Sequence, residues 1–392
     1  MKHELGISVY PDLSPIEDIK EYFKLASKYG FTRVFSSMFS VEGTKKEVLA
    51  FFTDMIEAAH ECNMKVALDV NAECFHKMGA SYNDLSVFAD IHVDILRLDV
   101  SFGIAKDIEM MSNPYGIVIE TNSSSGSVSR LIEGGAKPDQ FIVCHNFYPQ
   151  RYTGLPWKKF LKINDEIKRL GDIRIAAFVS SQNHPTHGVW DATQGLPTVE
   201  HLRDYPIDLQ TRILLATGKV DDILIGNAYA SEEELKSMQE VLNNDFDFFE
   251  TELGKLALAH GMVDKSQEVN HRVLKMVLDE DITDVEKELL FNFYPHAYIG
   301  DGSEWMMRMR FSRNVYNRKD KSIPARLYEK EYFEIGDVVV VNDNYKHYCG
   351  EVQIVKLPMK NDGTRNKVGY LSEGEQMLAS LINPFEIIIF KN

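Results

Sequence analysis

Phe141-Ile-Val-Cys-His-Asn-Phe-Tyr-Pro-Gln150 is an apolar, β-rich run that changes abruptly into polar and aromatic residues. A nearly continuous apolar run is typical of a parallel strand that is buried on both faces. In closed α/β barrels, the residues just past the carboxyl end of each strand line the mouth of the active site. The stretch therefore predicts a buried strand that delivers functional side chains at its end.

The same pattern of an apolar strand followed by a helix recurs along the first 240 residues. Predicted strands begin at residues 5, 32, 65, 95, 116, 141, 173 and 222, which leaves room for a helix and two loops in each repeat. Capping-box patterns at Ser14 to Glu17 and at Thr44 to Glu47 mark the first two helix starts. Eight such units predict a (β/α)8 TIM barrel over residues 1–240. An open doubly wound sheet is the rival fold, but Tyr10-Pro-Asp-Leu13 lacks the glycine fingerprint that usually follows its first strand.

The chain changes character after the predicted barrel. Residues 241–290 are expected to form a helical connection. Residues 291–392 are expected to form a smaller, mainly β domain, with short strands at 338–341, 350–356 and 387–390 and turn signals between them.

The composition limits the class of protein. A 44% apolar and 26% charged chain without a long apolar run predicts a globular protein that does not cross a membrane, and the absence of a signal-peptide pattern favours the cytoplasm. The four cysteines are scattered, which argues against disulfides and structural zinc. A net charge of -16 disfavours nucleic acid as a partner and gives an anionic substrate no long-range attraction, so an anion site has to be built locally.

Carboxylates and amides gather at the predicted strand ends, where the barrel mouth would be. A pair of carboxylates suits glycoside hydrolysis, because one protonated acid donates to the leaving oxygen while the other acts at the anomeric centre. Glu120 is the first candidate for the acid, since burial at the end of an apolar strand would raise its pKa, and Asp99 and Asp69 are candidates for the partner. Amide and aromatic side chains suit sugar hydroxyls and ring faces, and the candidates for substrate binding are Tyr10, Asn71, Asn122, His145, Asn146, Tyr148 and Asn227.

Each of these residues also has a structural interpretation. An acid at a strand end often caps a helix or pairs with an arginine, and a histidine there is often a hydrogen-bonded structural residue. No motif for a transition-metal site is present, so neither a metal nor another cofactor is expected, although Mg²⁺ held by two carboxylates stays open.

Phosphate or carboxylate groups have three candidate sites. Ser124 lies in a Ser/Gly run before a predicted helix, and Gly226 follows the eighth strand, where barrels commonly bind phosphate. In the second domain, Arg308 and Arg310 would lie on one face of a strand, and arginines can bind such anions bidentately.

Several short motifs, taken together in their order and spacing, resemble the MupG-type 6-phospho-N-acetylmuramidases of Gram-positive bacteria. The motifs span nearly the whole chain; they are Leu5-Gly-Ile-Ser-Val-Tyr-Pro11, Phe35-Ser-Ser-Met-Phe39, Leu68-Asp-Val-Asn71, Leu96-Arg-Leu-Asp99, Ile119-Glu-Thr-Asn122, Cys144-His-Asn-Phe-Tyr-Pro149, Ile225-Gly-Asn-Ala228 and Gly302-Ser-Glu-Trp305. The resemblance implies a (β/α)8 barrel followed by a cyclophilin-like β domain.

The resemblance also implies an activity. It is the intracellular hydrolysis of N-acetylmuramic acid 6-phosphate β-1,4-N-acetylglucosamine, a phosphorylated disaccharide of cell-wall turnover. Two other classes of function remain open on the residues alone: a sugar-phosphate lyase, aldolase or isomerase, and a phosphosugar-binding protein without turnover. A homodimer is also left open.

Overall fold

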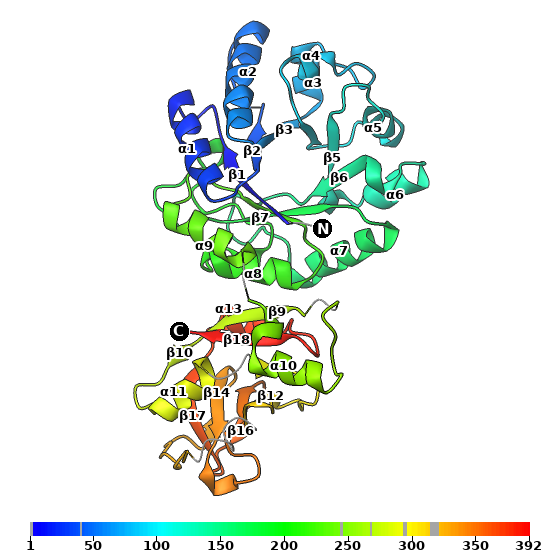
Figure 1. Ribbon diagram of the computed structural model, residues 1–392. Coiled ribbons are helices and arrows are strands. Elements are labelled where there is room, and N and C mark those ends of the chain that lie inside the picture. The colour runs from blue at the N-terminus through cyan, green and yellow to red at the C-terminus, as the bar shows by residue number, and fades with distance from the viewer. Residues whose placement is uncertain (1–2, 40, 244–245, 267–268, 293–295, 314–320) are drawn as a thin grey trace. The chain divides into compact units, whose positions relative to one another are not determined.

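The computed structural model describes residues 3–39, 41–243, 246–266, 269–292, 296–313 and 321–392. The chain forms two compact units, Met1–Asn244 and Asp245–Asn392 (Figure 1). The first unit holds the predicted barrel and the second unit is rich in β-strands.

Eight parallel strands close into a barrel in chain order, with β1 paired to β8. This confirms the predicted (β/α)8 fold and excludes the open sheet. The strands are β1 (Glu4–Val9), β2 (Arg33–Ser37), β3 (Lys65–Val70), β4 (Ile95–Leu98), β5 (Val118–Asn122), β6 (Phe141–Cys144), β7 (Ile175–Val179) and β8 (Asp222–Ile225).

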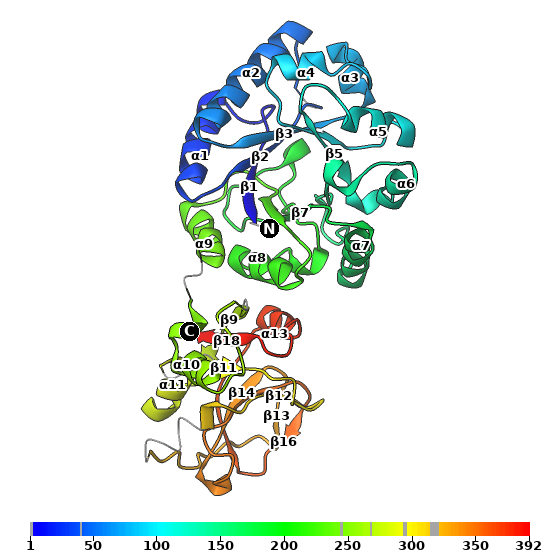
Figure 2. The same cartoon turned by 45° about the vertical axis from the view of Figure 1, so that its right-hand side comes forward.

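Helices surround the barrel, as Figure 2 shows. They are α1 (Ile16–Lys28), α2 (Lys45–Glu61), α3 (Ala72–Met78), α4 (Ser86–Asp90), α5 (Ile104–Met111), α6 (Val128–Glu133), α7 (Trp157–Leu170), α8 (Ile207–Ala216) and α9 (Glu232–Leu242). The apolar faces of these helices lie against strands such as β2 and β7, all of whose residues are buried. Burial on both sides explains why the strands are almost continuously apolar.

The two predicted capping boxes have different outcomes. Thr44 and Glu47 form the reciprocal box at the start of α2, as predicted. The box at Ser14 is wrong: Pro15 is the N-cap of α1 and makes no side-chain cap, while the Ser14 hydroxyl lies 3.1 Å from Nε2 of His187. A tertiary contact thus replaces the local hydrogen bond that the pattern predicted.

The described residues of the second unit form three small sheets. One has the order β10-β17-β14-β15-β12, another β11-β18-β9, and the last pairs β13 with β16. The strands are β9 (His271–Lys275), β10 (Val277–Leu278), β11 (His296–Ala297), β12 (Met306–Met309), β13 (Tyr332–Phe333), β14 (Asp337–Val341), β15 (Val352–Val355), β16 (Met359–Lys360), β17 (Arg365–Tyr370) and β18 (Ile387–Lys391); the helices are α10 (Glu252–Ala259), α11 (Asp284–Phe291) and α13 (Glu373–Ala379).

Residues 241–290 do not form the purely helical connection that was expected. This stretch supplies helix α10 but also strand β9, which pairs in parallel with β18 near the end of the chain. Its described residues from 246 onward are therefore part of the second unit, because a strand needs the hydrogen bonds of its neighbour in the sheet.

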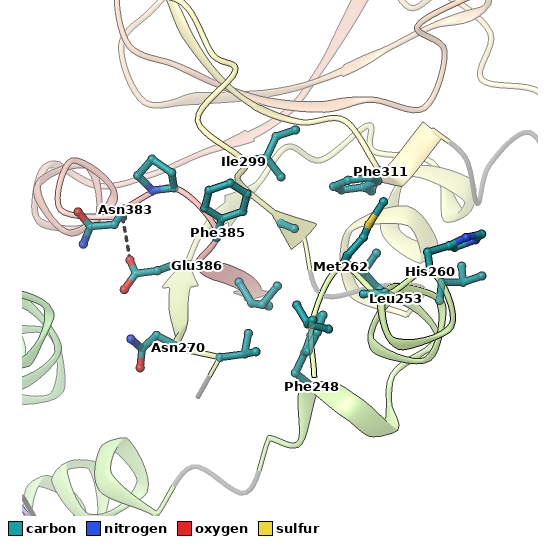
Figure 3. Close-up of a pocket in the computed structure, with 17 residues that line it drawn as sticks. Phe248, Leu253, His260, Met262, Asn270, Ile299, Phe311, Asn383, Phe385 and Glu386 are labelled. Atoms are coloured by element: carbon teal, nitrogen blue, oxygen red, sulfur yellow. Dashed lines mark hydrogen bonds between the residues drawn. The ribbon is translucent and has the colours of Figure 1, made fainter. Parts of the chain in front are cut away.

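The second unit also contains an apolar cavity of about 1130 Å³ that is open to solvent (Figure 3). Phe248, Met262, Phe311 and Phe385 contribute to its wall. Its polar residues include Glu386, whose carboxylate accepts a hydrogen bond from the backbone of Asn383 at 2.8 Å. Among the described residues that line this cavity, Glu386 is the one acid, whereas a glycosidase requires a pair.

Among the helices that the structure describes, none is long and apolar enough to cross a membrane.

Candidate active site

A cavity of about 370 Å³ in the first unit collects acids, amides and aromatic side chains. Polar groups that converge beside aromatic and apolar side chains are typical of small-ligand sites. The cavity is lined by Ser37, Phe39, Asp69, Asn71, Arg97, Asp99, Asn146, Phe147, Pro149, Val189 and Trp190. Most of these residues follow or end strands β2, β3, β4 and β6, as expected for a barrel mouth.

Arg97 connects the two acids of this cavity. Its Nη1 lies 2.5 Å from Oδ1 of Asp69 and 3.8 Å from Oδ1 of Asp99, and its Nη2 donates to the side-chain oxygen of Asn146. Asp69 is almost fully buried, whereas the Asp99 side chain is 36% exposed. The Asp69 carboxylate is therefore shielded from water, whereas the Asp99 carboxylate is partly exposed to it.

Opposing influences act on the pKa of Asp69. Burial raises the pKa of its carboxyl to about 6, although the positive charge of Arg97 lowers the pKa and the nearby Asp99 raises it again. A carboxyl group that titrates near pH 6 can give up and regain a proton under physiological conditions.

Glu120, the first candidate for the general acid, occupies a different place. Strand register puts Asp69 beside Arg97 and Arg97 beside Glu120, so the three residues form one row across β3, β4 and β5. Glu120 is fully buried, with Oε1 2.5 Å from Nη2 of Arg33. Glu120 is not among the described residues that line the cavity. It forms a buried ion pair with Arg33 instead.

Of the residues predicted to bind the substrate, Asn71 and Asn146 line the cavity. Asn71 also caps α3, with its Oδ1 accepting from the backbone of Cys74 at 2.9 Å. The described lining does not include Tyr10, Asn122, His145, Tyr148 or Asn227.

Comparisons with known proteins identify the family. Two family models match, the N-terminal part of the 6-phospho-N-acetylmuramidases of the MupG type over residues 5–240 and their C-terminal part over residues 272–391. The chain belongs to this family. It is a glycosidase of muropeptide recycling, as the resemblance implied, and nothing in the comparisons favours the lyase, aldolase, isomerase or sensor alternatives.

Two solved structures are similar over the whole length of this muramidase. An uncharacterized protein of B. cereus is 34% identical, with 100% of each chain covered and a TM-score of 0.81. A conserved protein of unknown function from Enterococcus faecalis is 21% identical over 99% of this chain and 96% of that chain, with a TM-score of 0.68, and shows the shared fold. A comparison with curated protein sequences gives no match.

His145 of the muramidase has a structural environment. Its ring is fully buried, with Nε2 2.7 Å from Oδ1 of Asn164 on α7 and Nδ1 3.2 Å from the hydroxyl of Ser124. Burial lowers the pKa of His145 to about 4, so the ring is neutral at physiological pH. The contact with Asn164 fixes the end of β6 against α7. The Ser124 hydroxyl, predicted to bind an anion, lies against the His145 ring.

Tyr10, Gly226 and Asn227 make structural contacts just past the carboxyl ends of β1 and β8. The Tyr10 hydroxyl donates to the carbonyl of Gly226, and a Cβ at Gly226 would lie 2.3 Å from the carbonyl oxygen of Leu196. Asn227 accepts from the backbone of Ser181 at 2.8 Å and donates to the hydroxyl of Thr186 at 2.8 Å. Gly226 is thus required for close packing, and a phosphate at this position stays a prediction.

Arg308 and Arg310 lie in the second unit, where each is paired with an acid. Arg308 donates from Nε and Nη2 to the two oxygens of the buried Glu351, at 2.7 and 2.9 Å. Arg310 donates to Asp301 at 2.9 Å. A substrate anion would have to compete with these carboxylates.

Sequence reasoning singled out neither Arg97 nor Trp190. Arg97 lies within the quoted motif Leu96 to Asp99, two residues before Asp99, and the two-residue period of a strand puts both on the same face. That period is the sequence signal by which Arg97 could have been placed beside Asp99. Trp190 lies in the long loop after β7, for which the sequence holds no comparable pattern.

Proposed function

We propose that Asp69 and Asp99 are the catalytic carboxylates with which this muramidase cleaves N-acetylmuramic acid 6-phosphate β-1,4-N-acetylglucosamine. The observation that supports this assignment is that both acids line one cavity and approach the same nitrogen of Arg97. Glu120 has a different role in this proposal, as the partner of Arg33 inside the barrel.

Asp69 is the general acid in this scheme. Its raised pKa keeps a protonated fraction available, and the proton passes to the glycosidic oxygen as the bond to the anomeric carbon breaks and N-acetylglucosamine leaves. The Asp69 carboxylate then takes a proton from a water molecule, which attacks the anomeric carbon and releases N-acetylmuramic acid 6-phosphate.

Asp99 acts at the anomeric carbon, either by attacking it or by orienting the N-acetyl oxygen that attacks it. Because both acids approach Nη1 of Arg97, their Oδ1 atoms lie no farther apart than the sum of 2.5 and 3.8 Å. That sum falls just below the roughly 6.5–9.5 Å at which inverting glycosidases hold their carboxyl groups. The spacing supports retention of configuration, which both routes produce.

Other cavity residues hold the sugar. Asn71 and Asn146 supply amides for hydroxyl or acetamido groups, and Phe147 supplies an apolar surface. The substrate carries a phosphate, which fits a cytoplasmic enzyme that acts after sugar import. Cytoplasmic location, a lack of affinity for nucleic acid and a homodimeric state remain predictions.

Hydrolysis of the phosphorylated disaccharide tests this proposal, with release of N-acetylglucosamine as the readout. Asp69→Asn and Asp99→Asn should each lower kcat by about 100-fold or more while substrate binding persists. Asp90→Asn, at an exposed position at the end of α4, is the control and should leave kcat unchanged. Full activity of Asp69→Asn would exclude Asp69 as the acid.

The configuration of the first product tests the geometry separately. Proton NMR of a fresh reaction should show the β-anomer of N-acetylmuramic acid 6-phosphate before mutarotation. An initial α-anomer would mean inversion and would contradict the close spacing of the two acids.

A further inference from the structure

Trp190 is an exposed aromatic residue at the edge of the catalytic cavity. Its side chain lines the cavity together with Asp69 and Asp99, yet the residue is 68% exposed. Tryptophan is usually highly buried, so an exposed one beside a site for a small molecule indicates a contact with a ligand.

The backbone at Trp190 has an unusual conformation. Its φ of 54° and ψ of 42° lie in the left-handed region, which is disfavoured for a bulky side chain. Residues held in this way concentrate at ligand sites, where the surrounding structure imposes the conformation.

The neighbours of Trp190 impose this conformation. Val189 is 3% exposed and belongs to the buried cluster that includes Tyr10 and Phe35. On either side, the backbone of Gly188 donates to the carbonyl of Ala192 and that of Ala192 donates to the carbonyl of Val189, both at 3.1 Å. With Val189 held inside, the turn directs Trp190 to the outside.

Backbone contacts tie the same loop to the barrel. His187 and Ala228 exchange backbone hydrogen bonds of 2.5 and 2.8 Å. Gly188 lies so close to Leu196 that an added Cβ would be 2.3 Å from its Cδ1. The indole is therefore carried on a fixed turn, which lowers the entropic cost of binding to it.

The depth of the cavity determines which sugar can reach Trp190. Asp69 is 5% exposed and Trp190 is 68% exposed, so the proposed proton donor is buried and the indole lies at the rim. A volume of about 370 Å³ is near the lower end for ligand pockets, which suits one enclosed sugar ring. The ring beyond the scissile bond must then extend toward the solvent.

We propose that Trp190 is a specificity-determining residue whose indole stacks on the ring of the leaving N-acetylglucosamine at the mouth of the cavity. The apolar C–H face of a pyranose packs against an aromatic face, which carries a partial negative charge that attracts the C–H groups. This inference rests on the proposed function, because it needs the scissile bond to lie at Asp69 and Asp99.

Two substrates separate this contact from the chemistry. One is the phosphorylated disaccharide, and the other is the methyl β-glycoside of N-acetylmuramic acid 6-phosphate, which lacks the second ring. Trp190→Ala should lower kcat/KM for the disaccharide about tenfold, mainly through KM, and leave kcat/KM for the methyl glycoside unchanged. Trp190→Phe keeps an aromatic face and should recover most of the loss.

Tyr152→Ala is the matched control. Tyr152 is also an exposed aromatic residue with a positive φ, of 71°, but it does not line the cavity. Its removal should leave kcat/KM for both substrates unchanged.

A binding measurement covers the case in which Trp190→Ala does not fold. Titration with N-acetylglucosamine should change the intrinsic fluorescence of the native enzyme, and Trp190→Phe should remove that change although Trp157 and Trp305 remain. A fluorescence change that persists in Trp190→Phe would overturn the stacking contact.

The kinetic outcomes distinguish the inference from the proposed function. Equal losses for the two substrates, or no loss for the disaccharide, would overturn the role of Trp190 while the native enzyme still hydrolyses the disaccharide. Failure of the native enzyme to release N-acetylglucosamine would overturn the proposed function and this inference with it.

Discussion

Asp69 and Arg97 form a buried ion pair in the floor of the barrel cavity, with Oδ1 2.5 Å from Nη1. Burial alone would keep the carboxyl group protonated, and the guanidinium alone would keep it ionised. The balance raises the pKa of Asp69 to about 6, which permits the group to act as an acid and then as a base.

The pH profile of the muramidase should reflect this balance. Asp69 is protonated below its pKa and loses the proton above it, so kcat/KM should decrease as the pH rises beyond about 6. The measurement is kcat/KM between about pH 4 and 9 for the native enzyme and Asp69→Asn. An unchanged alkaline decrease in the residual activity of Asp69→Asn would assign the titration to another group.

Arg97→Gln should move the alkaline decrease to higher pH. The positive charge of Arg97 lowers the pKa of Asp69, so its loss lets burial raise that pKa further. Arg97→Lys is the matched control, because it keeps the charge and should keep the decrease close to its native position, even if kcat falls through the lost contact with Asn146. A profile that does not move in Arg97→Gln would contradict the coupling.

Glu120→Gln distinguishes a structural ion pair from a catalytic acid. Glu120 and Arg33 are both buried, and removing one charge of such a pair costs about 3–5 kcal/mol of unfolding free energy. Denaturant unfolding should therefore show lower stability, while kcat of the folded enzyme changes only a few-fold. The exposed Glu109→Gln on α5 should alter neither quantity. Native stability with abolished hydrolysis would return the acid role to Glu120.

Arg308→Ala should destabilise the second unit. It removes the two hydrogen bonds to the buried Glu351, at an expected cost of about 2 kcal/mol, because Nη1 of Arg313 still lies 3.7 Å from Oε2 of that carboxylate. Arg310→Ala is the control, since its partly exposed pair with Asp301 should contribute less than about 1 kcal/mol. Unfolding is followed by the intrinsic fluorescence, to which Trp305 of the same unit contributes.

The kinetics of Arg308→Ala provide a separate result. If this arginine holds the substrate phosphate, its loss should weaken binding of the phosphorylated disaccharide far more than binding of the dephosphorylated analogue. Equal effects on both would leave Arg308 with its structural role alone.

Local patterns were sufficient for the barrel and for four residues that line its cavity, Asp69, Asn71, Asp99 and Asn146. The apolar runs before Asp69 and Asp99 located strands β3 and β4, and parallel strands in a closed barrel bring their carboxyl ends together. Asn71 and Asn146 were found by the same reasoning and line the cavity. The pattern did not separate Asn146 from its neighbour His145, whose ring is buried against Asn164 and Phe160.

The sequence by itself determined the eight strand-helix units of this muramidase and the acids at their ends, because the periods of strands and helices depend on nearby residues. Only the tertiary structure decided what each acid contacts. Glu120 meets Arg33, which is 87 residues away, and Asp69 meets Arg97, which is 28 residues away. Burial, pairing and the exposure of Trp190 depend on contacts between distant segments, and these form only when the barrel closes.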